Sequence, residues 1–395
     1  MTPLLSLIVP TRERATYLFH CLRTCLASDE PGLEVLVMDN ASSPETRAVV
    51  ERVGDPRLRY LRSDTRLSMR DNFERGLDAA RGEIICFLGD DDGILPGAVA
   101  EVISTFAALE LEALSAARAH YFWPDLQAVR RNTSLLPRGR GIVVQESRTE
   151  LRKLLSHNDY YRLPCLYHGF VRRTVADRIR QRQGGRFFMS NNADIYSAIA
   201  LSMEGLRFAY SGSPLVINGA SGRSNGASHF AAGAGGNEKS LWHKEDDLGF
   251  LPGFDGSMLM SSFIIDSTLR FARANPRTTL DDAFGVAAVR EALEQETRLR
   301  LAAGWCEDAA YRPFATSGLE RPAAGRMRWV SEAPSRPRKL LRAFLMTRPI
   351  DMQAEGISNI ADAAILLGGL RTSRQVGLLH APVRQVCAAL RMARA

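Results

Sequence analysis

The sequence lacks the two glycine-rich fingerprints with which many proteins hold phosphate. No G-x-G-x-x-G follows its first apolar run, and no G-x-x-x-x-G-K-[ST] occurs anywhere in its 395 residues. Both motifs use backbone amides to cradle phosphate groups. A phosphate-bearing ligand of this chain would therefore have to be neutralised by arginine side chains or by a bound cation.

Long apolar runs and closely paired cysteines are also missing. The sequence has no run of about 18 or more apolar residues and opens directly on a strand-like segment, so we expect neither a membrane-spanning helix nor a signal peptide. The six cysteines are scattered and include no C-x-x-C pair, which favours core packing over zinc or disulfide chemistry. These features predict a cytoplasmic protein without a structural metal.

Strand-like and helical patterns alternate through the first part of the chain. Short apolar runs occur at 4–9, 35–38, 58–61 and 84–88, with helical patterns at 17–25, 45–53 and 73–80 between them. This alternation predicts a parallel sheet with helices on both faces. In such sheets ligands bind beyond the carboxyl ends of the strands.

Polar side chains follow three of these apolar runs. Thr11 and Arg12 follow the first run, Asp39 follows the second, and the triplet 90–92 follows the fourth. Crowded carboxylates repel one another, and a divalent cation commonly relieves that repulsion. The alternative for the triplet is a solvated loop that caps a helix before Pro96. Because three strand ends meet at one edge, we favour a metal and ligand crevice.

In order and spacing, four segments resemble family 2 glycosyltransferases of the GT-A fold. The segments are 6–12, 35–42, 72–85 and 87–96. The resemblance extends over roughly the first 230 residues and is strongest in the first hundred. It implies inverting transfer of a sugar from a nucleoside-diphosphate sugar (UDP-, GDP- or dTDP-linked) to an acceptor hydroxyl. The acceptor would be a lipid-linked or cell-surface saccharide or a small molecule, and the cofactor a divalent cation, Mn²⁺ or Mg²⁺.

The resemblance also implies an α/β architecture, with a Rossmann-like, mostly parallel sheet flanked by helices. We expect the nucleotide-sugar-binding half of the GT-A domain at 1–112 and the acceptor-binding half at 113–234. The remaining residues, 235–395, support several apolar helical faces and predict a mainly α-helical C-terminal region. Homo-oligomerisation is one role open to that region.

Site residues follow from matching the family's motifs to this chain. The residues expected to bind the nucleotide sugar are Pro10, Thr11, Arg12, Asp39, Arg70, Asn72 and Asp90. Asp91 and Asp92 are the expected metal ligands. Many family members read L-D-x-D-D, whereas this chain has Gly89 at the first acidic position. Which pair of the triplet touches the metal therefore stays open.

Inverting transfer needs a general base to take the proton of the acceptor hydroxyl. The best match to the family's base is Asp194, which opens an apolar helical pattern and is preceded by Ala193 where the family has glutamate. Alternatively, Asp194 only complements the helix dipole. The aromatic stretch 157–169 suits stacking on sugar rings, and partly buried core is the equal alternative.

A glycine-rich polar segment, 218–229, follows a strand-like run. Such segments are commonly flexible linkers, but in a glycosyltransferase one of them can close over the diphosphate. In that case Arg223 would pair with phosphate and His229 would be a further metal ligand.

Basic residues gather in the segment 321–348, which holds eight arginines and lysines against the single acid Glu332. Interleaved apolar residues make it a candidate for peripheral contact with an anionic membrane, at the inner face of the cell membrane. A solvated helical face is the alternative. No nucleic-acid-binding module is recognisable, so we expect no nucleic-acid partner.

Two other functions fit parts of the pattern. A nucleotidyltransferase also places aspartates and a metal on a Rossmann-like sheet, but it would usually show a Gly/Arg-rich phosphate loop where this chain has 10–14. A non-catalytic sugar-binding or partner-binding module could keep Asp39 and lack a working base.

Overall fold

The computed structural model describes residues 3–126, 130–224, 246, 248–257, 259–322 and 347–372. His229 and nearly all of the basic segment 321–348 lie outside the described residues, so the predictions for them are not addressed by the structure. The same holds for Cys387.

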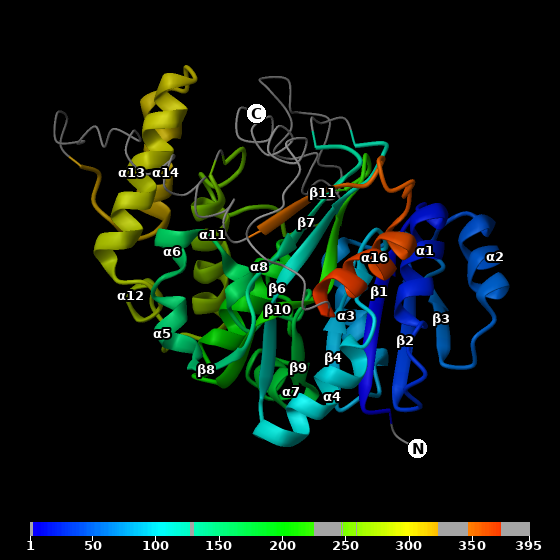
Figure 1. The fold of residues 1–395 in the computed structure, drawn as a ribbon. Helices are drawn as coiled ribbons and strands as arrows, with labels where there is room; N and C mark the ends of the chain where they lie inside the picture. Colours follow the sequence, from blue (N-terminus) through cyan, green and yellow to red (C-terminus); the bar gives the residue numbers. More distant parts are fainter. Residues whose placement is uncertain are drawn as a thin grey trace.

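The first part of the chain forms the expected parallel sheet (Figure 1). The strands are β1 (Leu5–Thr11), β2 (Leu33–Asp39), β3 (Leu58–Arg62) and β4 (Ile84–Phe87), in the spatial order β4-β1-β2-β3. The intervening helices are α1 (Ala15–Cys25), α2 (Pro44–Val53) and α3 (Met69–Ala79). All neighbouring pairs among these four strands are parallel. The prediction of a parallel βα repeat is confirmed.

Local sequence explains where the helices begin. Pro44 occupies the first turn of α2, where its missing N–H costs no hydrogen bond. The Ser68 side chain accepts a hydrogen bond of 3.0 Å from the Asp71 amide and so caps α3. Helix α2 ends at Gly54, whose φ of 62° is the left-handed conformation that commonly closes a helix.

The second part of the sheet is mainly antiparallel. It comprises β5 (Gly93–Ile94), β6 (Ala113–Phe122), β7 (Thr133–Pro137), β8 (Ile142–Glu146), β9 (Phe170–Arg172) and β10 (Arg207–Ala220). Its helices are α4 (Ala98–Leu109), α5 (Ser147–Leu151), α6 (Leu154–His157), η1 (Tyr160–Arg162), α7 (Arg173–Arg182) and α8 (Ala193–Ser202). Among the described residues only β10 with β6 adds a parallel pair, and six strand pairs are antiparallel. The α/β class, a sheet flanked by helices, is thus confirmed, but the sheet is mixed rather than mostly parallel.

Helices cover both faces of the sheet, and each face has its own apolar core. One core joins side chains of α1, α2 and α4, for example Leu18, Val50 and Val102. The other joins side chains of α3, α7 and α8, for example Phe73 and Ile179. Four cysteines are buried and free, in accord with core packing: Cys21, Cys25, Cys86 and Cys165.

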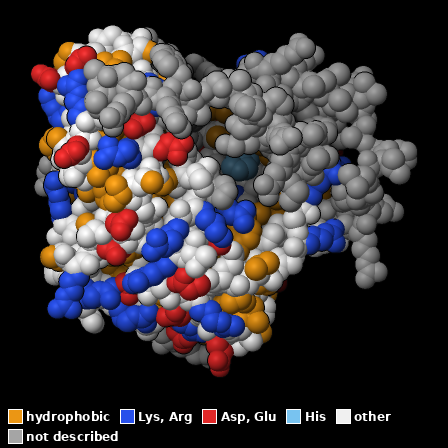
Figure 2. All heavy atoms as spheres, turned by 90° about the vertical axis from the view of Figure 1, so that its left-hand side faces the viewer, with side chains coloured by type: hydrophobic (Ala, Val, Ile, Leu, Met, Phe, Trp, Pro, Cys, Tyr) orange, Lys and Arg blue, Asp and Glu red, His pale blue; other side chains and the backbone are white. Residues whose placement is uncertain are grey.

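A helical group follows β10 and packs on the α8 side of the sheet. It consists of α11 (Met260–Ala274), α12 (Leu280–Ala283), α13 (Val286–Ala302) and α14 (Glu307–Thr316), and α11 contacts α8 directly. On the face seen in Figure 2, acidic and basic side chains alternate with scattered apolar ones, which is typical of a solvated surface. No described helix is long and apolar enough to cross a membrane.

The described C-terminal segment returns to the first half of the fold. Strand β11 (Thr347–Asp351) pairs antiparallel with β7, and α16 (Ile360–Thr372) crosses α1 (Figure 1). Ile360 and Leu367 of α16 are buried in the core that α1 and α4 share. Residues 347–372, which we expected within a mainly helical C-terminal region, thus add a strand to the sheet and a helix to one of its faces.

Candidate functional site

The carboxyl ends of β1, β4 and β10 bring polar side chains into one cluster. Asp90 is 2% exposed and accepts hydrogen bonds from Thr11 Oγ1 at 2.7 Å and from Arg14 Nη1 at 2.8 Å. Thr11 ends β1, and Arg14 lies directly before α1. The loop after the first strand thus holds the first carboxylate of the triplet.

Asp91 is held by a different segment from Asp90, namely the turn that follows β10. Its Oδ2 accepts a hydrogen bond of 2.6 Å from Ser221 Oγ and a second one from Ser224 Oγ. Its Oδ1 lies 3.7 Å from Arg14 Nη1. The pKa of Asp91 is raised to about 6, mainly because burial disfavours the charged carboxylate. The positive charge of Arg14 lowers this pKa in part, and the neighbouring carboxylates raise it further.

Asp92 points into the protein and is held by four donors. Its Oδ2 accepts from the Gly89 amide, from Tyr167 OH and from His168 Nε2, at 2.6, 2.7 and 2.6 Å. Its Oδ1 accepts from the Gly219 amide at 2.8 Å. Burial by itself would raise the pKa of Asp92, but the paired His168 and the other donors bring that pKa below its usual value. Asp92 therefore ties β4, β10 and the loop before β9 together.

Gly89 stands where the family resemblance led us to expect the first acid of the motif, and the packing explains the glycine. A Cβ atom at this position would lie 2.6 Å from Asp92 Oδ2 and 2.7 Å from Tyr167 OH. A side chain of any size would displace the hydrogen bond between those two groups. The glycine is thus linked to the inward orientation of Asp92.

Few carboxylate oxygens remain for a metal ion. Among the described residues, no group of three or more His, Cys, Asp and Glu side chains has the arrangement of a metal site. In the triplet, the oxygens of Asp90 and Asp92 already accept hydrogen bonds, whereas for Asp91 Oδ1 the polar contact seen with a described residue is the more distant Arg14. Mg²⁺ is often bound through one or two carboxylates together with substrate phosphates and water. The donor set is compatible with such a site, in which Asp91 Oδ1 would be the protein ligand.

Asp39, expected at the nucleobase, is fully buried at the end of β2. Its Oδ1 accepts from the Ser42 amide at 3.0 Å and its Oδ2 accepts from Tyr60 OH, while Arg62 Nε lies 3.7 Å away. Burial, together with the bond to Asp39, raises the pKa of Tyr60 to about 12. The carboxylate is thus oriented by β3 and by the loop that leads into α2.

Two other expected donor-site residues serve as anchors for α3. Asn72 Nδ2 donates to the Met38 carbonyl at 3.0 Å, which ties α3 to the end of β2. Arg70 Nε donates to Asp246 Oδ2 at 3.3 Å, and both side chains are nearly buried. The structure therefore places Arg70 and Asn72 in packing contacts between segments.

Arg223, expected to pair with phosphate, lies near the loop after β1. The residue is exposed, and its Nη1 donates to the Glu13 carbonyl at 2.8 Å. Pro10 and Arg12 belong to the same strand end and loop and are half-buried. Residues 218–220, expected in a loop, still belong to β10, because they continue its pairing with β6.

Asp194 is partly exposed at the start of α8, and an aromatic row connects it to the aspartate cluster. Its Oδ2 accepts a hydrogen bond from Tyr160 OH. The rings of Tyr160 and Tyr161 are 3.9 Å apart, and those of Tyr161 and His168 are 6.0 Å apart. His168 in turn binds Asp92. The stretch 157–169 thus runs between the two sites that we expected for donor and acceptor.

Five side chains of this cluster were not among the predicted site residues. Arg14, Tyr167, His168, Ser221 and Ser224 contact the triplet directly. Arg14 follows Thr11 and Arg12 in the same loop, so its position was a usable signal. His168 belongs to the aromatic stretch 157–169 and the two serines to the polar segment 218–229, but no local pattern linked them to the triplet, since their contacts span large sequence separations.

Comparison with known proteins agrees with this geometry. Residues 6–175 match the family described as Glycosyl transferase family 2. A glucosyltransferase from Campylobacter jejuni named for GalNAc(5)-diNAcBac-PP-undecaprenol is 36% identical over 104 residues, which are 26% of this chain and 34% of that protein. The succinoglycan biosynthesis protein ExoO from Rhizobium meliloti is 29% identical over 101 residues, 26% of this chain and 29% of that protein. The chain thus matches only about a third of each relative's length.

Solved structures show weaker likeness over more of the chain. The S. aureus TarS fragment 1–349 in complex with UDP-GlcNAc has a TM-score of 0.46 at 15% identity, covering 76% of this chain and 73% of that one. The mannosyltransferase PcManGT from Pyrobaculum calidifontis, in complex with GDP-Man and Mn²⁺, has a TM-score of 0.39 at 19% identity, covering 82% of this chain and 89% of that one. The likeness to glycosyl transferase family 2 therefore rests on the sequence match of residues 6–175.

Proposed function

We propose that this protein is an inverting glycosyltransferase that moves a sugar from a nucleoside-diphosphate sugar to an acceptor hydroxyl. The observation that carries the proposal is the convergence of Arg14, Asp90 and Asp91 at the carboxyl edge of a family 2 sheet. This edge is where ligands bind in open α/β sheets.

The donor would lie across the ends of β1 and β2. Asp39, oriented by Tyr60 and Ser42, would accept hydrogen bonds from the base, with Pro10, Thr11 and Arg12 beside it. Asp90 would lie near the ribose. The guanidinium groups of Arg14 and Arg223 would face the diphosphate, for which a planar fork of donors is well suited.

Asp91 is the residue that we assign to a divalent cation, Mn²⁺ or Mg²⁺. The cation, when bound, would offset the charge that develops on the leaving diphosphate. Ser221 and Ser224 hold Oδ2 of Asp91, and the proposed ligand atom is the other oxygen, Oδ1. We assign Asp92 to positioning rather than to metal binding, because four donors already occupy its two oxygens.

Asp194 is the proposed general base. Its carboxylate is partly exposed, and Tyr160 OH holds one oxygen in place. In the proposed step, Asp194 takes the proton of the acceptor hydroxyl while that oxygen attacks the anomeric carbon from the face opposite the diphosphate. Aromatic side chains of 157–169 would stack on the acceptor sugar.

The relatives suggest the class of acceptor. One is named for an undecaprenol-linked glycan and another for succinoglycan biosynthesis. We therefore propose a saccharide of a bacterial cell-surface polymer, free or lipid-linked, as the acceptor. A lipid-linked acceptor would be compatible with peripheral contact at the membrane through 321–348.

The experiment that tests the proposal screens UDP-, GDP- and dTDP-sugars with Mn²⁺ or Mg²⁺. Thermal-shift measurements identify the stabilising nucleotide, because at a fixed ligand concentration a tighter-binding ligand stabilises the folded protein more. Release of nucleoside diphosphate from one donor, with an inverted anomeric product on a saccharide acceptor, would support the proposal. Pyrophosphate-dependent exchange would favour a nucleotidyltransferase, and binding without any donor turnover would favour a non-catalytic module.

A further inference from the structure

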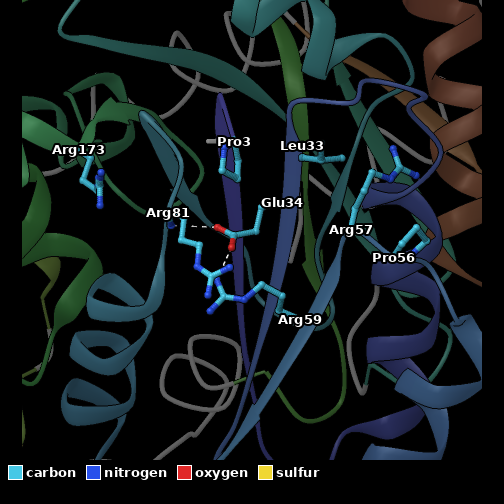
Figure 3. Close-up of a pocket in the computed structure, with 8 residues that line it drawn as sticks. All are labelled: Pro3, Leu33, Glu34, Pro56, Arg57, Arg59, Arg81 and Arg173. Atoms are coloured by element: carbon cyan, nitrogen blue, oxygen red, sulfur yellow. Dashed lines mark hydrogen bonds and ion pairs between the residues drawn. The ribbon is translucent and has the colours of Figure 1, made fainter. Parts of the chain in front are cut away.

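A basic groove lies at the opposite edge of the sheet from the candidate site. It has a volume of about 670 Å³ and is lined by Arg57, Arg59, Arg81, Arg173 and Glu34 (Figure 3). These residues surround the starts of β2 and β3, whereas Asp39 and Thr11 lie at the far ends of β2 and β1. A seven-residue strand spans about 20 Å, so a ligand here would not touch the aspartate triplet.

Two of the four arginines are already engaged by the protein. Arg57 forms an ion pair with Asp55 at 2.7 Å and also donates to the Leu26 and Ser28 carbonyls. Arg59 Nη1 donates to Glu34 Oε1 and to the Ala79 carbonyl. These contacts orient both guanidinium groups along the wall of the groove.

The other two arginines keep most of their donors for a ligand. Arg81 is exposed, and no hydrogen bond of its guanidinium to a described residue is present, although its backbone amide donates to Glu34 Oε2 at 3.0 Å. Arg173 Nη1 has one long contact, 3.4 Å, with the Ala80 carbonyl. Neither guanidinium forms an ion pair with a described carboxylate. In Figure 3 the side chains of Arg59 and Arg81 extend toward each other, and Arg173 lies across the groove from Arg57.

Glu34 does not make the groove attractive to a cation. It is 3% exposed, and its two oxygens accept from Ser6 Oγ, the Arg59 guanidinium and the Arg81 amide. Its single charge is balanced by Arg59, and Arg57 is balanced by Asp55. The uncompensated charge of the groove is therefore that of Arg81 and Arg173.

We propose that this groove binds an anion with at least two phosphate-type charges, such as a pyrophosphate group. Guanidinium groups match phosphate oxygens through paired N–H donors, and the volume lies in the range of small-molecule sites. Pro3, Leu33 and Pro56 add an apolar wall that suits a phosphate carried on a larger body. The groove is separate from the proposed donor site, and its test does not depend on glycosyl transfer.

The test compares two double variants of the full chain. Arg81→Gln with Arg173→Gln removes the two unbalanced charges. The control, Arg178→Gln with Arg182→Gln, removes the same charge from exposed positions of α7 that pair with Glu112 and Glu204 instead. Inorganic pyrophosphate is titrated calorimetrically into each protein in EDTA. Sedimentation with phosphatidylcholine vesicles that contain about a quarter phosphatidylglycerol, against pure phosphatidylcholine, measures headgroup binding.

We expect the groove variant to bind pyrophosphate at least about tenfold more weakly than the control variant, because each charge-assisted contact contributes substantially to affinity. Pyrophosphate can also bind at the donor site, but it does so equally in both variants, so this binding does not affect the difference between them. If the groove variant loses binding to the anionic vesicles alone, the phosphate-type ligand of the groove is a lipid headgroup. Equal titrations and equal sedimentation for the two variants would overturn the proposal, and circular dichroism checks that both are folded.

Discussion

Arg14 Nη1 lies 2.8 Å from Asp90 Oδ1, and the same nitrogen is 3.7 Å from Asp91 Oδ1. The guanidinium group therefore sits beside the one oxygen of the triplet that we assign to a metal ion. Burial lowers the pKa of Arg14, but the two carboxylates raise it by more, so the net shift is upward and Arg14 remains a permanent positive charge.

Arg14→Gln is expected to increase the affinity of the donor-free protein for Mn²⁺. The substitution removes a cation that competes for Asp91, and the gain should be roughly tenfold. Titration followed by electron paramagnetic resonance of free Mn²⁺ measures it directly. Arg62→Gln is the control, because Arg62 lies beside Asp39 instead. Unchanged or weaker Mn²⁺ binding in Arg14→Gln would show that the two cations do not compete.

Asp91→Asn should reduce donor turnover by roughly a hundredfold or more, because removing a preorganised charge at a developing anion typically costs that much. It should also weaken Mn²⁺ binding, since Asp91 Oδ1 is the proposed ligand. Folding should persist, because the asparagine side chain can still accept the hydrogen bonds of Ser221 and Ser224. Full turnover in Asp91→Asn would remove Asp91 from the mechanism.

Asp194→Asn is expected to leave donor binding unchanged and to reduce transfer by about a hundredfold or more, the usual contribution of a general base. Nucleotide binding by calorimetry and product formation by mass spectrometry separate the two effects. Tyr160→Phe is the companion variant, because it removes only the hydrogen bond to Asp194. Its loss of transfer should be smaller. Transfer at the native rate in Asp194→Asn would require a different base.

Gly368→Ala should destabilise the protein by about 1–3 kcal/mol, the usual cost of overpacking. A Cβ at this position of α16 would lie 2.9 Å from Pro96 Cδ, close after the aspartate triplet. Gly369→Ala is a matched control in the same helix, since no atom lies within 4 Å of its added Cβ. That change should be neutral or stabilise by up to about 1 kcal/mol through helix propensity. Thermal midpoints of the two variants decide the point, and equal midpoints would contradict close packing of α16 on Pro96.

The stability of the protein should depend on the protonation of His120. Burial, with the nearby charge of Arg118, lowers the pKa of His120 to about 3, below its value near 6.5 in an unfolded chain. His120 is thus neutral in the folded protein. Its contribution to the free energy of unfolding is complete above pH 6.5 and is lost as the pH falls toward 3. Between pH 7 and pH 5 the loss is about 2 kcal/mol.

Urea unfolding at these two pH values measures this effect. The free energy of unfolding of His120→Gln should fall by about 2 kcal/mol less than that of the native protein. Parallel losses in both proteins would assign the pH dependence to other groups.

Much of the N-terminal half was predictable from local pattern. The apolar run before Pro10 and the capping pair Ser43 and Pro44 define strand and helix without reference to the rest of the chain. Because parallel strands end at a common edge, Thr11 and the triplet 90–92 were also expected to meet. The antiparallel pairing of β6 with β9 was not anticipated. The hydrophobic pattern of a strand shows which of its faces are buried, but it does not show the direction in which the strand runs in a mixed sheet.

The sequence alone determined the βα repeat, the two-sided burial of its strands and the gathering of aspartates at one edge, because these follow from side-chain periodicity and from short connections. Only the tertiary structure decided which partners hold each aspartate of the triplet. Asp92 turns inward because His168 and the Gly219 amide reach it from distant segments, and Asp91 is oriented by Ser221 and Ser224 after β10. Such long-range hydrogen bonds depend on how strands pair across the sheet, and no local pattern encodes that pairing.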